Sequence, residues 1–245
     1  MRPARLFTQL VDVLYPPRCA ACEARLASDT ALCHACRESL LSVAATGCPR
    51  CARVTLDPPA GVGPHLCGPC VTDPPPYDRI HAAWVYGAAI QDAIARWKNR
   101  PDPTLAGPLG KLLIEGLTAS RTLARSLDAI VVPVPSPRRR ILMRGLNPAG
   151  VLAAHVAREL GLDLVPGALT LGAVRARSRG LGRRERATRM RGAFRAAPTR
   201  VRDRPVVLVD DVVTTGATVA ECARVLRAAG APRVEVIALA RVPSP

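Results

Sequence analysis

Aromatic side chains are scarce in this chain of 245 residues, since Phe, Tyr and Trp make up only 3% of it. Proteins that bind many unpaired bases stack them on aromatic rings, so the composition argues against extensive base stacking as its main activity. No run of about 18 apolar residues occurs, which argues against a membrane-spanning helix. The hydrophobic content of 49% excludes general disorder and is sufficient for a packed core.

Lysine is also nearly missing, because only Lys98 and Lys111 occur among the 35 basic residues, which leaves 33 arginines. Against 19 acidic residues the formal net charge is +16. Residues 138–204 contain 17 of the arginines, and residues 175–195 contain nine arginines and one glutamate. Three interpretations are open for 175–195: a loop that closes on a diphosphate, a track for the backbone of single-stranded DNA, or a solvated loop without a specific ligand.

Eight of the nine cysteines form four CxxC pairs within residues 19–70. Two such pairs present four thiolates to one point, an arrangement typical of structural Zn²⁺. The pairs therefore predict two structural Zn²⁺ ions, with reactive dithiols or disulfides as the alternative. The default assignment follows chain order, and exchange of one pair between the sites is the other possibility. The predicted ligands are Cys19, Cys22, Cys33 and Cys36 for one ion, and Cys48, Cys51, Cys67 and Cys70 for the other.

Neighbouring histidines, His34 and His65, are not needed as ligands, because eight cysteines complete both sets. The first 17 residues lack the apolar core and cleavage site of a signal peptide, and they predict a short docked helix. We therefore expect a cytoplasmic location, where paired cysteines hold metal more often than they oxidise. The remaining cysteine, Cys222, lies on the apolar face of a predicted helix and is expected in the core.

The Pro-rich segment 71–78 divides the chain into a cysteine module, residues 1–75, and a second domain, residues 76–245. In the second domain we predict strands at 80–86, 129–135, 206–209 and 234–240, and helices at 88–98, 104–119, 148–160 and 218–229. Continuous apolar strands alternating with amphipathic helices are typical of an α/β fold whose parallel sheet is flanked by helices.

The most informative segment is VVLVDDVVTTGAT, residues 206–218. A buried strand delivers two carboxylates to its carboxyl end, where open α/β sheets bind ligands. A turn of small residues then leads into a helix, whose amides form an anion cradle. Carboxylates suit ribose hydroxyls or a Mg²⁺ ion, and the cradle suits a phosphate, so the segment predicts a sugar-phosphate site. Its residues are Asp210, Asp211, Val212, Val213, Thr214, Thr215, Gly216, Ala217 and Thr218.

This segment resembles the phosphoribosyl pyrophosphate (PRPP) signature of type I phosphoribosyltransferases. Together with the CxxC pairs, PVP at 133–135, RGLN at 144–147, ERATRMRGAF at 185–194 and a closing AR at 240–241, the whole chain resembles the ComF family, which is associated with natural competence. The resemblance implies that Asp210 and Asp211, the best catalytic candidates, contact the ribose hydroxyls, and that the following loop holds the 5′-phosphate.

By the same resemblance, the turn after strand 129–133 is the pyrophosphate loop, with Val134, Pro135, Ser136, Arg138 and Arg144 near a diphosphate bound with Mg²⁺. A solvated basic turn at 138–140 is the alternative, and Asn147 is expected either to contact ligand or to cap the helix that follows it. Because the chain ends just after its last strand, we expect residues 79–125 to build any hood over the acceptor. There, Trp97 is expected in the core, and Lys98 could steer a ligand.

Two functions follow. The first is a PRPP-binding protein that transfers phosphoribosyl to an acceptor, or binds another phosphorylated sugar. The alternative is a non-catalytic competence module that binds single-stranded DNA and competence proteins and keeps only the phosphoribosyltransferase fold. The two functions are compatible with each other, and binding measurements with PRPP and DNA distinguish them.

Overall fold

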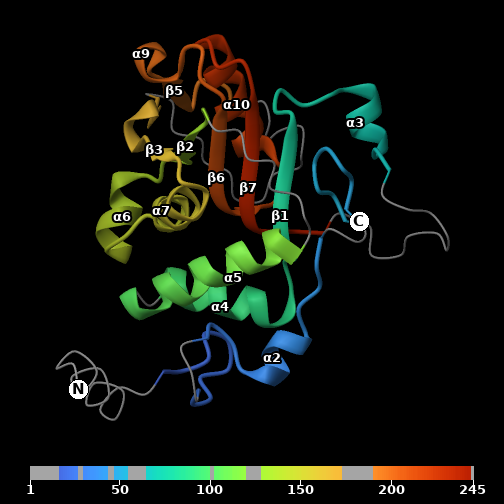
Figure 1. Ribbon diagram of the computed structural model, residues 1–245, viewed down its shortest axis with the longest axis vertical. Helices are drawn as coiled ribbons and strands as arrows, with labels where there is room; N and C mark the ends of the chain where they lie inside the picture. Colours follow the sequence, from blue (N-terminus) through green and yellow to red (C-terminus); the bar gives the residue numbers. More distant parts are fainter. Residues whose placement is uncertain are drawn as a thin grey trace.

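The computed structural model describes residues 17–26, 30–43, 47–54, 65–99, 102–119, 128–172 and 190–243 (Figure 1). The predicted N-terminal helix and residues 175–189 of the basic segment lie outside these ranges. None of the helices in the described part of the chain is both long and apolar enough to cross a membrane.

A five-stranded parallel sheet forms the centre of the fold, in the order β1-β7-β6-β2-β3. Its strands are β1 (Arg79–Val85), β2 (Ile130–Pro133), β3 (Asp163–Leu164), β6 (Val206–Val213) and β7 (Val234–Arg241). The predicted α/β fold class is therefore confirmed. Strand β6 runs four residues beyond its predicted end, because Val212 and Val213 still pair with β7.

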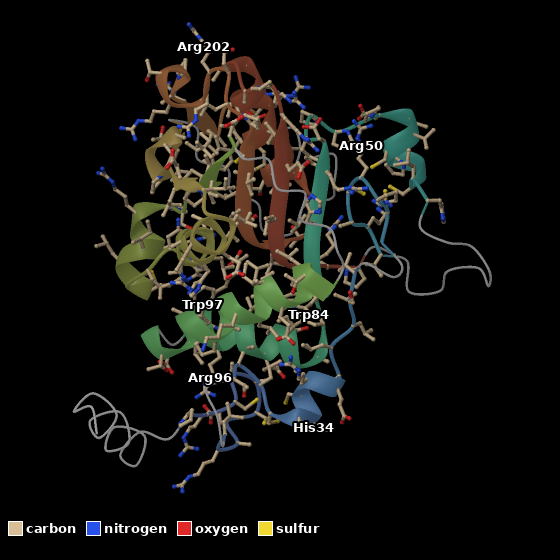
Figure 2. All side chains as sticks on the ribbon, viewed as in Figure 1. His34, Arg50, Trp84, Arg96, Trp97 and Arg202 are labelled. Carbon is tan, nitrogen blue, oxygen red and sulfur yellow. The ribbon has the colours of Figure 1, made fainter. Side chains whose placement is uncertain are left out.

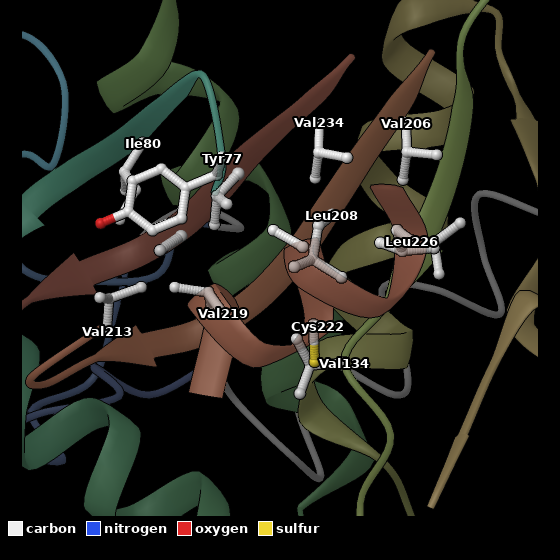
Figure 3. Packing of buried hydrophobic residues seen from close by; sticks show 14 of the residues in the cluster. Tyr77, Ile80, Val134, Val206, Leu208, Val213, Val219, Cys222, Leu226 and Val234 are labelled. Carbon is white, nitrogen blue, oxygen red and sulfur yellow. The ribbon is translucent and has the colours of Figure 1, made fainter. Parts of the chain in front are cut away.

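Helices cover both faces of this sheet, as buried apolar clusters on its two sides show. One cluster joins the sheet to α10 (Ala217–Ala228) through residues such as Val219, Cys222 and Leu226 (Figure 3). The other joins it to three helices, α4 (Ala88–Asn99), α5 (Ala106–Ala119) and α7 (Pro148–Leu160). A 3₁₀ turn, η1 (Pro103–Leu105), precedes α5.

The predicted core positions are confirmed on both faces. Cys222 is fully buried in α10. On the other face, Ile90, Ile94 and Trp97 point into the core from α4, because their spacing places them on one side of the helix.

Several short elements were not predicted. The arginines expected in a turn begin a helix, α6 (Arg138–Arg144), so the prediction of a turn there is wrong. Gly145, in the left-handed conformation with φ 69°, ends it. A small antiparallel ribbon lies between β3 and β6 in the chain, and it pairs β4 (Leu169–Leu171) with β5 (Phe194–Ala196). The turn η2 (Pro166–Ala168) precedes this ribbon, and α9 (Pro198–Val201) follows it.

The cysteine segment packs directly on this sheet. It contains two short helices, α2 (His34–Glu38) and α3 (Gly68–Thr72). Between them, Ser42 bridges Trp84 in antiparallel orientation, and the Leu41 carbonyl accepts a hydrogen bond of 2.8 Å from the Val85 amide. Residues 41–43 therefore extend the sheet beyond its β1 edge.

Candidate functional site

The eight paired cysteines form two tetrads in chain order. Within each tetrad the four sulfur atoms lie within 4.8 Å of one another. The Sγ atoms of Cys22 and Cys33 are 3.6 Å apart, and those of Cys51 and Cys67 are 3.5 Å apart. Tetrahedral Zn²⁺ with bonds of about 2.3 Å requires sulfur separations of about 3.8 Å. Both tetrads therefore fit a zinc ion, and neither His34 nor His65 belongs to them.

Electrostatics also favour a cation in the first tetrad. Burial raises the pKa of Cys19, but hydrogen bonds from the backbone of Cys22, Cys33 and Ala21 outweigh it and lower the pKa to about 7. In the same tetrad, burial and the neighbouring sulfurs raise the pKa of the Cys36 thiol. One sulfur therefore ionises more readily than another, because burial and the neighbouring sulfurs together oppose a second charge. A divalent cation is what allows all four to be thiolates.

Each tetrad is fixed to a different part of the sheet domain. Near the first tetrad, Arg96 of α4 donates a hydrogen bond of 3.3 Å to the Cys19 carbonyl and pairs with Glu23 at 2.5 Å. Near the second, the Ile80 amide of β1 donates a hydrogen bond of 2.8 Å to the Arg50 carbonyl. Figure 2 shows this separation, with Arg96 beside the first tetrad and Arg50 beside the edge of the sheet.

Asp210 and Asp211 lie within β6, where the regular ladder is interrupted. Pairing with β7 includes Asp210 and resumes at Val212, but skips Asp211. The Asp211 amide donates a hydrogen bond of 2.9 Å to Asp210 Oδ1, and the Val212 amide donates one of 2.8 Å to Asp211 Oδ1. Each carboxylate thus accepts a hydrogen bond from the backbone amide of the residue that follows it.

Lys98, at the end of α4, is the counter-ion of this pair. Its Nζ lies 2.6 Å from Asp211 Oδ2, with 25% of the lysine side chain and 14% of the aspartate side chain exposed. Burial first, and repulsion from Asp211 second, raise the pKa of Asp210 to about 8, although Lys98 acts in the opposite direction. Burial and the neighbouring carboxylate thus favour the protonated form of Asp210 more than in an exposed aspartate. Lys98 was predicted only as a residue that could steer a ligand.

The turn after the carboxylates leads into α10, as predicted. Gly216 has a φ of 83°, in the left-handed region that favours glycine, and α10 begins at Ala217. A Cβ atom on Gly216 would lie 3.6 Å from the Tyr77 hydroxyl, so Tyr77 packs against the turn. Figure 3 shows Tyr77 in the same buried cluster as Val213 and Val219, on either side of this turn.

The loop that follows β2 lies beside β6, because the Val134 amide donates a hydrogen bond of 2.9 Å to the Val209 carbonyl. Asn147 supports this loop: its Oδ1 accepts a hydrogen bond of 2.9 Å from Ser136 Oγ, and its Nδ2 donates one of 3.4 Å to the Val134 carbonyl. Asn147 occupies the N-cap position of α7, but its side chain makes no capping hydrogen bond. The proposed capping role is therefore wrong.

The remaining predicted residues of this loop take different places. Pro135 is half-buried beside Ser136, Arg138 is exposed at the first turn of α6, and Arg144 is half-buried at its last residue. The two predicted loops thus follow β2 and β6, which are adjacent strands. Because the carboxyl ends of parallel strands meet at one edge of a sheet, both loops border the place where such sheets bind ligands.

Glu221 of α10 was not predicted, and it holds the far end of the basic segment. Its Oε1 accepts a hydrogen bond of 2.8 Å from the Gly192 amide, and Arg224 donates to both of its carboxylate oxygens. Burial raises the pKa of Glu221, but these hydrogen bonds outweigh it and lower the pKa overall. Gly192 is therefore held against α10, the helix that begins directly after Gly216.

Comparisons with known proteins match both halves of the chain. A family model described as a double zinc ribbon domain matches residues 10–74, and one described as a phosphoribosyl transferase domain matches residues 141–245. The chain is 35% identical to the DNA utilization protein YhgH of Escherichia coli over 220 residues, which cover 86% of this chain and 96% of the relative. It is 30% identical to Competence protein F of Haemophilus influenzae over 178 residues, which cover 71% of this chain and 78% of that relative. With both domains in this order, the chain belongs to the ComF family of double-zinc-ribbon proteins with a phosphoribosyltransferase domain.

Proposed function

We propose that this chain binds PRPP, or another phosphorylated sugar, with Mg²⁺ at residues Asp210–Thr218. The observation that carries the proposal is the direct succession of two carboxylates in β6, a left-handed Gly216 and the N-terminus of α10. Carboxylates accept hydrogen bonds from vicinal hydroxyls, and a helix N-terminus with a preceding glycine turn binds phosphate. A sugar phosphate satisfies both groups in one orientation.

The chemistry that this arrangement supports is phosphoribosyl transfer. The bond between C1 and the diphosphate oxygen breaks, the diphosphate leaves with that electron pair, and a nucleophile bonds to C1. Bound Mg²⁺ would neutralise the charge on the leaving diphosphate. In the chain itself, Asp210 and Asp211 would orient the ribose, the turn 214–218 would hold the 5′-phosphate, and the loop 134–136 with Arg138 and Arg144 would contact the diphosphate.

Both tetrads, in this proposal, hold structural Zn²⁺. Four cysteine ligands leave no coordination position for water or substrate, so the ions would support the fold and take no part in the reaction. Thiolates in zinc sites are compatible with the reducing cytoplasm, which is the proposed location.

A role in DNA use is the second candidate function, and the names of the relatives favour it. In this role the arginines between 138 and 204 would contact the phosphates of single-stranded DNA, and competence proteins would be partners. Affinity dominated by phosphate contacts falls steeply with salt. A shallow salt dependence, or unchanged DNA affinity when Arg183, Arg184 and Arg186 become alanine, would count against it.

Calorimetry with PRPP and MgCl₂ tests the first proposal. We expect binding by the wild type, and none by the double variant Asp210→Asn with Asp211→Asn, at unchanged zinc content. Asp163→Asn is the matched control, because Asp163 is exposed and pairs with Arg204 away from the phosphate loop. Lack of binding by the wild type would refute the proposal, as would full binding by the double variant.

A further inference from the structure

Arg241 is the last residue of β7 and closes the AR motif at 240–241. It is only 2% exposed. Its backbone lies between the two neighbouring strands, opposite Val213 of β6 and Val85 of β1. A guanidinium at this position is costly to bury unless its donors are satisfied, so its partners indicate what it does.

The side chain of Arg241 joins the phosphate loop to the second tetrad. Its Nη1 donates hydrogen bonds to the carbonyls of Val213, at 3.0 Å, and of Thr214, and another to its neighbour Val242 at 3.2 Å. Its Nε donates one of 3.2 Å to the carbonyl of Cys51, a member of the second tetrad. One rigid, planar group thus contacts the first residues of the loop and a predicted zinc ligand.

The contacts of Arg241 also bear on the direction of two amides. The Val213 carbonyl is shared with the Val242 amide, which donates a hydrogen bond of 3.0 Å to it, whereas the Thr214 carbonyl accepts from the Arg241 side chain. In a planar trans peptide the C=O and N–H bonds point in opposite directions. With the carbonyls of Val213 and Thr214 turned toward Arg241, the amides of Thr214 and Thr215 point away from it. These are the first amides of the predicted phosphate cradle.

We propose that Arg241 is a positioning residue that couples the second tetrad to the phosphate loop. By holding the two carbonyls, it turns the Thr214 and Thr215 amides toward the 5′-phosphate of the ligand. By bonding the Cys51 carbonyl, it makes that orientation depend on an ordered, metal-loaded tetrad. The inference rests on the proposed sugar-phosphate site and adds a physical link between that site and the metal.

Arg241→Lys is the informative variant, because it retains the charge but cannot reach both the loop and Cys51 with a planar fork. Arg227→Lys is the matched control. Arg227 also joins distant segments, through Asp78 at 2.5 Å and the Pro232 carbonyl, but it contacts neither the loop nor the tetrad.

Two measurements on the full chain decide the question. Calorimetry with ribose 5-phosphate, and with PRPP and Mg²⁺, should show affinity at least about tenfold lower in Arg241→Lys, the loss expected for a charge-assisted hydrogen bond. Hydrogen exchange without ligand should show faster exchange at the Thr214 and Thr215 amides. We expect Arg227→Lys to leave the ligand affinity and the amide exchange rates unchanged. The zinc content of Arg241→Lys and of Arg227→Lys should equal that of the wild type.

Coupling to the metal is tested by a cycle that adds Cys48→Ser, which removes a sulfur of the second tetrad without altering Cys51. In the wild-type background this change should weaken ribose 5-phosphate binding and speed exchange at Thr214 and Thr215. In the Arg241→Lys background the further loss should be smaller, because the link is already broken. Where Cys48→Ser does not fold, partial zinc removal by a chelator replaces it in the same exchange measurement.

The outcomes separate the inference from the proposed function. If the wild type binds neither ligand, the proposed function is refuted, and the exchange data alone decide whether Arg241 links tetrad and loop. If the wild type binds and Arg241→Lys binds equally well, the positioning role is refuted while the proposed function stands. Additive effects of Cys48→Ser and Arg241→Lys would refute the coupling.

Discussion

Removal of the Lys98 ammonium should destabilise the fold through Asp211, and the size of this effect follows from their geometry. At 2.6 Å, with an effective dielectric constant of about 20, the attraction between the two charges is roughly 6 kcal/mol. Desolvation of both ions offsets most of this attraction. Because charge-assisted hydrogen bonds contribute about 1.5–3 kcal/mol net, we expect Lys98→Met to lower the free energy of unfolding by about 2 kcal/mol.

Urea unfolding at pH 7.5 with excess zinc measures this free energy, for Lys98→Met, Asp211→Asn and the double variant. In the double-mutant cycle, the sum of the free energies lost by the two single variants should exceed the free energy lost by the double variant. The difference, which is the coupling energy between Lys98 and Asp211, should be at least about 1.5 kcal/mol. The coupling should fall only slightly in high salt, because the pair is partly buried and poorly screened. Lys111→Met is the control, since it removes the only other lysine from an exposed position.

A coupling below about 0.5 kcal/mol would contradict this reasoning, since that value is typical of exposed ion pairs. It would mean that the Lys98 ammonium stays hydrated in solution. Equal losses for Lys98→Met and Lys111→Met would contradict it as well, because only Lys98 faces a carboxylate of the candidate site.

Three further predictions concern the supports of the site. Glu221→Gln should lower the free energy of unfolding by about 1–2 kcal/mol at pH 7 in urea unfolding; because the pKa of Glu221 is lowered, this contribution is present above the ordinary carboxyl pKa and lost as the pH falls through the lowered folded-state pKa, so a cost that does not shrink on acidification below the ordinary carboxyl range would contradict the assignment. Metal analysis should find two zinc ions per chain, with chelation lowering the melting temperature and Cys222→Ser leaving the zinc content unchanged; fewer than two ions in the wild type would contradict the tetrad assignment. Asn147→Ala should weaken PRPP binding several-fold at a stability cost of about 1 kcal/mol, because Val134 and Ser136 lose their shared partner; unchanged binding would exclude a supporting role for Asn147.

The features that could be predicted from the sequence are local ones. CxxC spacing predicts two sulfur tetrads, with chain order as the default pairing. The apolar runs predict four of the five strands of the described sheet, because those four are largely buried, whereas the short exposed strand β3 has no such run. The left-handed turn at Gly216 and the helix after it follow from the order of small residues. Gly161 ends α7 in the left-handed conformation, the position after a helix at which glycine is favoured.

The features that were missed join residues far apart in the chain. Lys98 and Asp211 meet because α4 packs on the same sheet as β6, which no local pattern reveals. Asn147 has the sequence context of a helix cap, yet its side chain binds the loop after β2 because that loop offers both a donor and an acceptor. The helix over Arg138–Arg144 was missed for a different reason: three consecutive arginines after a proline give no apolar periodicity.

The position of the two tetrads changes what the cysteine segment is expected to contribute. A module used only for docking would need few specific contacts with the sheet domain. Here the first tetrad is bound by Arg96 of α4, the helix that also brings Lys98 to Asp211. The second is bound by Arg241, which also holds the start of the phosphate loop. Each tetrad is therefore bound to one side of the candidate ligand site, the first to the helix that meets the carboxylates and the second to the start of the turn before α10. If the tetrads hold zinc as proposed, order in the candidate site should therefore depend on the metal, and zinc removal should disorder both of its sides.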